Sequence, residues 1–264
     1  MKADTLKIFL NQAILHIAIV SFDLDTCFSQ HISNTRINLS LIIVPLTTMI
    51  SYKYQCIFVH IPKAGGTSVE DVIWPSNHDR TEANLWKGLV GEYSNKYQTG
   101  GLQHLLASQI RQEVSEDIFN QFFKFTVVRN PWDKAVSQFS YMKTRPDLRQ
   151  LIGMKENTEF KTYLALIQET KHIQWEEQYK FFLDENGEDI VDFVGRLENF
   201  NRDLLKILEK INRKSPLVAR KIENIPHSKK SIRSHYKDYY DDESKEIVHQ
   251  LYARDIDILG YTFE

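Results

Sequence analysis

The sequence predicts an α/β protein whose central, mainly parallel sheet is flanked by helices. Three apolar runs of strand length, at residues 54–60, 122–128 and 191–194, alternate with segments of helical periodicity. The first two are largely apolar along their length, which is typical of strands buried on both faces of a parallel sheet. The alternation starts at residue 52 and continues to the end of the chain.

The helices are expected between and after these strands. They are predicted at residues 67–74, from near residue 103, after Pro131, across residues 158–183, and at residues 201–211 and 242–253. Pro131 suits the first turn of a helix, because proline lacks an N–H group that this turn would leave unpaired. Asn186-Gly187 is typical of a tight turn before the third strand.

Residues 1–48 differ from the rest of the chain, because they contain no glycine and show no clear period. We expect them to be an N-terminal extension outside the core, with Met49 as the natural start and residues 49–264 as the functional domain. The apolar stretch at residues 8–22 is short for a membrane span. We therefore expect a cytoplasmic protein, with membrane association through the N-terminal segment as the alternative.

The charge balance excludes one class of partner. The chain has 33 basic and 35 acidic side chains, so its composition gives no case for binding nucleic acid. Its two cysteines are Cys27 and Cys56, and Cys56 lies in the first predicted strand. A disulfide framework is therefore not expected.

A candidate anion-binding loop, residues 60–68 with the sequence HIPKAGGTS, follows the first predicted strand. Gly65 and Gly66 allow a sharp turn and a close approach to a ligand. A helix begins just after them, and a helix N-terminus suits a phosphate or a sulfate. The candidate anion contacts are Lys63, Ala64, Gly65, Gly66, Thr67 and Ser68.

This loop differs from the loop that binds nucleoside triphosphates. That pattern, GxxxxGK[ST], places its lysine after the glycines, whereas Lys63 comes before them. A glycine turn without a ligand is the alternative interpretation. The residues of the loop favour an anion site over this alternative, but they leave the anion open.

A second candidate site follows the second predicted strand. Arg129 ends this strand, at the edge of an α/β sheet where ligands bind, and Ser137 lies on the next predicted helix. Arginine can give a phosphate two parallel hydrogen bonds, and a serine hydroxyl can donate another. The alternative is an ion pair between Arg129 and Asp133.

Taken together, the two motifs resemble those of sulfotransferases that use 3′-phosphoadenosine 5′-phosphosulfate, of the carbohydrate type (sulfotransferase family 2). In that family HIPKxGGTS is the 5′-phosphosulfate loop, matched by residues 60–68, and VRNPxxRxxS is the 3′-phosphate site, matched by residues 128–137. Lys134 departs from the usual arginine, and Ala64 from a common threonine. The resemblance covers most of residues 52–264 and implies a P-loop-like fold of three layers.

The resemblance also implies the chemistry, which is transfer of the sulfuryl group to an acceptor hydroxyl, expected on a carbohydrate, without a metal. Lys63 would be the cation on the leaving 5′-phosphate. Related enzymes place a catalytic histidine in the segment that holds His104, which would be the general base. The alternative role for His104 is a helix cap, with Glu70 and Glu92 as weaker candidates for the base. His60 is expected to be structural.

Residues 220–237 are locally basic. In the family this region holds a loop over the cofactor. The candidate contacts to the 3′-phosphate, or to an anionic acceptor, are Lys229, Lys230, Ser231 and Arg233. The alternative is a solvated run of charges.

Two other functions stay open at this point. One is a nucleoside-triphosphate-dependent kinase with a degenerate phosphate loop, and the other is a non-catalytic nucleotide-binding protein. Against the kinase stands the position of Lys63. Against the binding protein stands the joint presence of Lys63, His104, Arg129 and Ser137. The sequence indicates neither the identity of the acceptor nor the oligomeric state.

Overall fold

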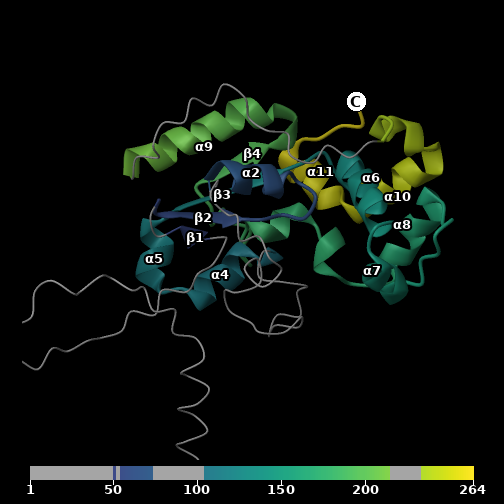
Figure 1. The fold of residues 1–264 in the computed structure, drawn as a ribbon, viewed down its shortest axis with the longest axis horizontal. Coiled ribbons are helices and arrows are strands. Elements are labelled where there is room, and N and C mark those ends of the chain that lie inside the picture. Colours follow the sequence, from purple (N-terminus) through teal and green to yellow (C-terminus); the bar gives the residue numbers. More distant parts are fainter. Residues whose placement is uncertain (1–49, 52–53, 74–103, 215–232) are drawn as a thin grey trace, which may run out of the picture. The chain divides into compact units, whose positions relative to one another are not determined.

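The computed structural model describes residues 50–51, 54–73, 104–214 and 233–264 (Figure 1). These residues form one four-stranded sheet in the order β1 (Ile50–Ser51), β2 (Cys56–Val59), β3 (Phe123–Val128), β4 (Phe193–Arg196). Strand β1 pairs antiparallel with β2, while β2, β3 and β4 pair in parallel. The predicted mainly parallel sheet is confirmed. The division at residue 48 falls outside the described residues and stays a prediction.

Helices cover both faces of the sheet, as Figure 1 shows. Phe58 and Phe125 share one buried cluster with residues of α2 (Gly66–Ile73) and α9 (Phe200–Lys214). Ile57 and Val59 belong to a second cluster with residues of α4 (Ala107–Glu113) and α5 (Glu116–Gln121). Successive residues of a strand point to opposite faces, so the two clusters lie on opposite sides of β2. The predicted α/β fold of three layers is confirmed.

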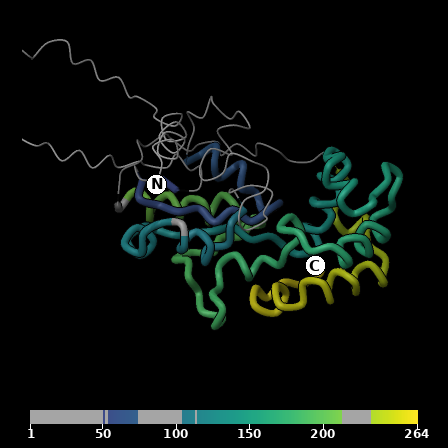
Figure 2. Tube along the Cα trace, turned by 90° about the horizontal axis from the view of Figure 1, so that it is seen from below, coloured from purple at the N-terminus to yellow at the C-terminus, as the bar shows by residue number. Residues whose placement is uncertain are grey.

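A group of helices continues from the end of β3. It comprises α6 (Pro131–Met142), α7 (Pro146–Leu151), α8 (Phe160–Gln168), α10 (Asp242–Leu251) and α11 (Ala253–Leu259). Figure 2 shows the two C-terminal helices of this group, α10 and α11, in yellow, alongside its other helices. Helix α10 packs against α6 and α8. Within the described ranges, no helix is both long enough and apolar enough to cross a membrane.

Helix α6 starts where the sequence predicts. Pro131 is its first residue, and the side-chain oxygen of Asn130 accepts hydrogen bonds from the amides of Trp132 (3.0 Å) and Asp133 (3.4 Å). An asparagine cap of this kind satisfies N–H groups that a helix leaves unpaired at its start. The cap fixes the direction of α6 directly after Arg129.

The helix predicted across residues 158–183 is wrong in length. Only α8 is α-helical there, and two 3-10 turns follow, η2 (Ile173–Trp175) and η3 (Gln178–Phe181). Side chains take the backbone N–H groups that a continuous helix would need. The ring of His172 accepts from the amide of Gln174, and Asp255 accepts from the amides of Gln178 and Tyr179. The contacts with Asp255 tie η3 to α11.

Candidate active site

The predicted anion loop connects β2 to α2 through a tight turn. Lys63 and Gly65 both adopt left-handed backbone conformations, with φ of 64° and 86°. The amides of Ser68 and Val69 both donate to the carbonyl oxygen of Gly65, at 3.0 and 3.3 Å, and so begin the helix. The amide of Gly66 comes before these bonds, as the first amides of every helix do. Such a turn at a helix N-terminus is a favourable place for an anion.

The imidazole ring of His60 packs against this loop. A Cβ atom placed on Gly66 would lie 1.9 Å from the Nε2 atom of His60, so the ring occupies the space that a side chain would need. The Nδ1 atom of His60 lies 3.0 Å from a carboxylate oxygen of Glu70 on α2. Both side chains are buried. The ring therefore packs between the loop and its helix.

His104 lies directly beside His60. Its Nδ1 atom is 3.1 Å from the backbone carbonyl oxygen of His60, and the two rings meet edge to face with centroids 4.7 Å apart. A carbonyl oxygen only accepts hydrogen bonds, so Nδ1 carries the proton and Nε2 keeps its lone pair. Burial, followed by the charge of His60, lowers the pKa of His104 well below its usual 6.5. His104 is therefore a neutral imidazole that can accept a proton at Nε2.

Lys63 shares the electrostatic environment of His104. Its charge is one of the causes that lower the pKa of His104. The Nζ atom of Lys63 lies 4.0 Å from the centroid of the Tyr141 ring on α6, a cation–π contact. The two candidate catalytic side chains therefore belong to the same region of the protein.

The second candidate site is built around the guanidinium group of Arg129. Its Nε and Nη2 atoms donate to one oxygen of Asp133, at 2.8 and 2.7 Å. The guanidinium of Arg233 donates to the other oxygen of the same carboxylate. The ion pair between Arg129 and Asp133, which the sequence left as an alternative, is present. Two of the residues expected at the 3′-phosphate, Arg129 and Arg233, also come together there.

Arg129 also contacts the loop. Its Nη1 atom donates to the backbone carbonyl oxygen of Lys63 over 3.0 Å. Burial lowers the pKa of Arg129 but leaves a guanidinium group charged at neutral pH. The two motifs are therefore joined by a direct, charge-assisted hydrogen bond.

The remaining predicted site residues are placed as follows. Ser137 is buried on α6, four residues after Asp133 and eight after Arg129, a spacing that puts all three on one side of the helix and its entry. Lys134 is buried and its Nζ atom donates to the backbone carbonyl of Glu176 (2.9 Å). Glu92, Lys229, Lys230 and Ser231 lie outside the described residues.

Sequence reasoning assigned no role to two residues that hold the backbone of this site. The side-chain amide of Gln178 bonds to both the N–H and the carbonyl group of Arg129. One oxygen of Glu198 accepts from the amide of Asn130 (2.6 Å), and the other accepts from the hydroxyl of Tyr261 (2.9 Å). Each pairing joins residues far apart in the chain, so no local pattern could have indicated them.

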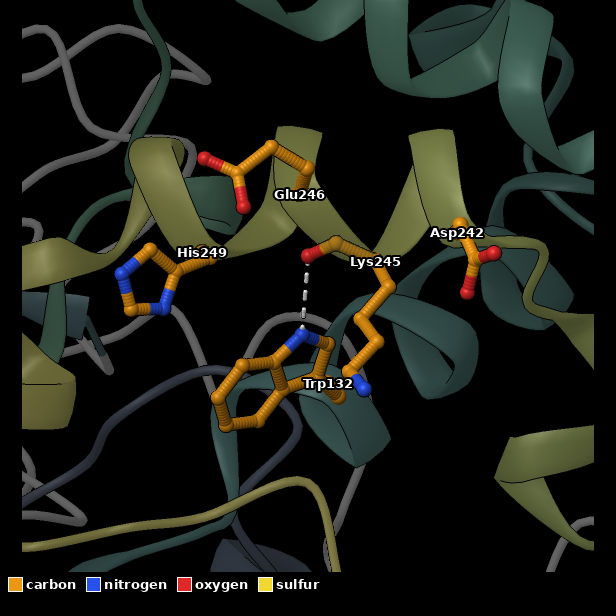
Figure 3. A pocket seen from close by; sticks show the side chains of 5 residues that line it. All are labelled: Trp132, Asp242, Lys245, Glu246 and His249. Carbon is orange, nitrogen blue, oxygen red and sulfur yellow. Dashed lines mark hydrogen bonds between the residues drawn. The ribbon is translucent and has the colours of Figure 1, made fainter.

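A pocket lies next to this site, between α6 and α10 (Figure 3). It has a volume of about 260 Å³, and its lining consists of Trp132, Asp242, Lys245, Glu246 and His249. The indole N–H of Trp132 donates to the backbone carbonyl of Lys245 (3.1 Å). None of the candidate catalytic or anion-binding residues lines this pocket.

Comparison with known proteins identifies the family. The family model described as "Sulfotransferase family" matches residues 46–262, which include every candidate site residue. The chain belongs to the sulfotransferase family. Over 114 residues, this sulfotransferase is 29% identical to an uncharacterized protein of Archaeoglobus fulgidus, an alignment that covers 43% of the chain and 88% of the relative. No solved structure matches the chain.

Membership of the family makes the protein a transferase that moves sulfuryl groups. In the ranges that the structure describes, no group of three or more His, Cys, Asp or Glu side chains could hold a metal ion. The expectation that transfer needs no metal stays a prediction.

Proposed function

We propose that this sulfotransferase moves the sulfuryl group of 3′-phosphoadenosine 5′-phosphosulfate to a hydroxyl group of a carbohydrate. The observation that carries the proposal is the 3.0 Å hydrogen bond between the guanidinium of Arg129 and the carbonyl oxygen of Lys63. This donor carries anionic groups on both ends of one adenosine, so it needs two anion sites at a short, fixed separation. The contact between the two motifs supports such a pair of sites.

The anion loop and the site around Arg129 would each bind one end of the donor. The amides of residues 65–67, the hydroxyl of Ser68 and the side chain of Lys63 would bind the 5′-phosphosulfate and balance the charge that develops on the leaving phosphate. Arg129, Arg233 and Ser137 would bind the 3′-phosphate. Lys229 and Ser231 are proposed as further contacts to it.

His104 would act as the general base. Its lowered pKa keeps the ring unprotonated at neutral pH, so its lone pair on Nε2 can accept a proton. The acceptor hydroxyl would lose its proton to Nε2 as its oxygen attacks the sulfur atom in line with the leaving phosphate.

The identity of the donor is tested by comparing how the product nucleotide and a competing nucleotide bind. We expect adenosine 3′,5′-bisphosphate to raise the melting temperature in the presence of a chelator, and ATP with Mg²⁺ to raise it much less. The Lys63→Ala and Arg129→Gln variants should each lose most of this shift, whereas His249→Ala, outside the site, should keep it. Stabilisation by ATP and Mg²⁺ alone would favour the kinase instead.

A transfer assay tests the reaction and the acceptor. The protein, a donor with a labelled sulfuryl group and a panel of glycans should yield a labelled carbohydrate. Binding of the bisphosphate without transfer to any hydroxyl compound would favour the non-catalytic nucleotide-binding protein. Labelling of a lipid or a small phenol, with none of the glycans labelled, would replace the carbohydrate in this proposal.

The cytoplasmic location is likewise a proposal, with membrane association through residues 1–48 as its alternative. Fractionation of the cells that make the protein tests it, because the activity should stay in the supernatant after the membranes are removed.

A further inference from the structure

The side chain of Gln178 holds both backbone hydrogen-bonding groups of Arg129. Its Oε1 atom accepts from the N–H of Arg129 (2.9 Å), and its Nε2 atom donates to the carbonyl oxygen of the same residue (2.8 Å). The parallel pairing of β3 with β4 ends one residue earlier, at Val128 and Arg196. The glutamine amide therefore replaces a neighbouring strand where the sheet has stopped.

Gln178 is itself fixed by buried contacts. It is fully buried, and its backbone N–H donates to one oxygen of Asp255 while that of Tyr179 donates to the other, both at 2.8 Å. Asp255 is fully buried on α11. Two residues before Gln178, the carbonyl of Glu176 accepts from Lys134 on α6. Moving Gln178 would break several of these hydrogen bonds in the interior, where unpaired polar groups are costly.

The backbone of Arg129 sets where its guanidinium group can reach. That group contacts both Asp133 and the carbonyl oxygen of Lys63. Hydrogen bonds of arginine to phosphate or carboxylate need both atoms of the fork in line, and they weaken steeply when the angle is lost. A shift of the backbone at the end of β3 would therefore weaken the hydrogen bonds of the Arg129 guanidinium group to an anion.

We propose that Gln178 is a positioning residue that aims Arg129, so that the site distinguishes nucleotides with a 3′-phosphate from those without one. The inference rests on the proposed function, because it takes Arg129 as a contact of the 3′-phosphate. Gln178 touches the backbone of Arg129 and acts through it.

The test is the ratio of two dissociation constants, for adenosine 3′,5′-bisphosphate and for adenosine 5′-phosphate, measured by calorimetry. In Gln178→Met, which keeps the length but loses both hydrogen bonds, the preference for the bisphosphate should fall about tenfold, the size of one charge-assisted hydrogen bond. Binding of the 5′-phosphate should change little, which also shows that the variant is folded.

Gln138→Met is the matched control. Gln138 is a buried glutamine on α6, and neither atom of its amide has a hydrogen-bond partner in the part of the chain that the structure describes. This control should keep the preference of the wild-type protein. An unchanged ratio in Gln178→Met, or an equal loss in Gln138→Met, would overturn the inference.

A second variant guards against failure of the first to fold. In Gln178→Glu, the protonated carboxyl group can accept from the N–H of Arg129 and donate to its carbonyl, whereas the carboxylate can only accept. The preference for the bisphosphate should therefore approach that of the wild type at mildly acidic pH and fall at alkaline pH. Asp255, Lys134 and Glu177 are ionisable groups near this position in both proteins, so the variant is compared with the wild type at each pH.

The outcomes separate the inference from the proposed function. A wild-type protein without any preference for the bisphosphate would remove the proposed donor, and this inference with it. A wild-type preference that survives in Gln178→Met, and at every pH in Gln178→Glu, would remove only the role of Gln178.

Discussion

The Nδ1 atom of His104 donates a hydrogen bond to the backbone carbonyl oxygen of His60, the residue that follows strand β2 and begins the anion loop. This single bond determines which ring nitrogen of His104 can accept a proton. It also ties the candidate base to the backbone that leads into Lys63. A shift of the loop would therefore move both candidate catalytic residues together.

Replacing His104 by alanine should reduce kcat roughly 100-fold or more, the usual size of a general-base contribution. The variant should still bind adenosine 3′,5′-bisphosphate, because no anion contact is assigned to this ring. Single-turnover transfer and calorimetry measure the two effects. The control is His249→Ala, at the pocket beside Trp132. Turnover of His104→Ala near the wild-type rate would reject the base.

The pH dependence of turnover should reflect the burial of His104. Burial lowers its pKa well below 6.5, so the ring stays unprotonated, and able to act as a base, into mildly acidic solution. The rate should therefore fall only at pH values well below 6.5. A profile of kcat/KM against pH measures this, and a fall centred above 6.5 would contradict the assignment.

Gly66→Ala should destabilise the loop. The new Cβ atom would lie 1.9 Å from Nε2 of His60, a clash that must displace the ring or the backbone. Overpacking of this kind costs about 1–3 kcal/mol in the free energy of unfolding. Chemical denaturation measures the loss.

The matched control is Gly195→Ala, whose Cβ would meet its nearest atoms at 3.4 Å. The double variant Gly66→Ala with His60→Ala should recover part of the stability, because the clash is removed. Equal losses with and without His60 would show that the ring is not the cause.

Asp133→Asn should lower the stability of the ligand-free protein and increase the stabilisation that a bound anion gives. The Asp133 carboxylate lies between the guanidinium groups of Arg129 and Arg233, so removing its charge leaves two like charges close together. Breaking a largely buried ion pair from one side costs about 3 kcal/mol. We expect a lower melting temperature in buffer.

Adenosine 3′,5′-bisphosphate should then stabilise Asp133→Asn more than the wild type, since a phosphate can supply the missing negative charge. Melting curves with and without the nucleotide measure both effects. A variant that loses stability but gains no extra shift would place the 3′-phosphate elsewhere.

Lys134→Met should change how stability depends on pH. Burial lowers the pKa of Lys134 from 10.5 to about 8, whereas the unfolded chain keeps the ordinary value. Between about pH 8 and 10.5 the unfolded state therefore binds more protons, so this lysine makes stability rise with pH. The methionine variant should lose that rise. Urea titrations across this range measure it, with the exposed Lys237→Met as control.

The local features of the fold were predictable because local chemistry determines them. The apolar runs predicted β2 and β3, and Pro131 predicted the start of α6, which Asn130 caps. The third strand was placed two residues early, at 191–194, whereas β4 runs from Phe193 to Arg196. The position of β4 is determined by its pairing with β3, which ends at Arg196, and this pairing is not visible in the local sequence.

The individual residues of the candidate site were predictable from the sequence, but the hydrogen bonds that connect them were not. The sequence indicated Lys63 and Arg129 from their neighbours in the chain, and His104 through the family resemblance. It could not indicate that Arg129 bonds to the carbonyl of Lys63, or that Gln178 holds the backbone of Arg129, because both contacts depend on tertiary packing. The contact between Arg233 and Asp133, which links Arg233 to Arg129, joins residues that are 100 apart in the chain.

The left-handed backbone of Lys63 has a consequence for how this family member balances stability against activity. A residue with a Cβ atom at φ of 64° costs about 1 kcal/mol that a glycine would not incur. The chain therefore keeps a lysine where glycine would give a more stable turn. Selection for thermal stability alone would tend to remove this lysine, the proposed cation on the leaving phosphate. Designs that stabilise the protein should leave this position unchanged.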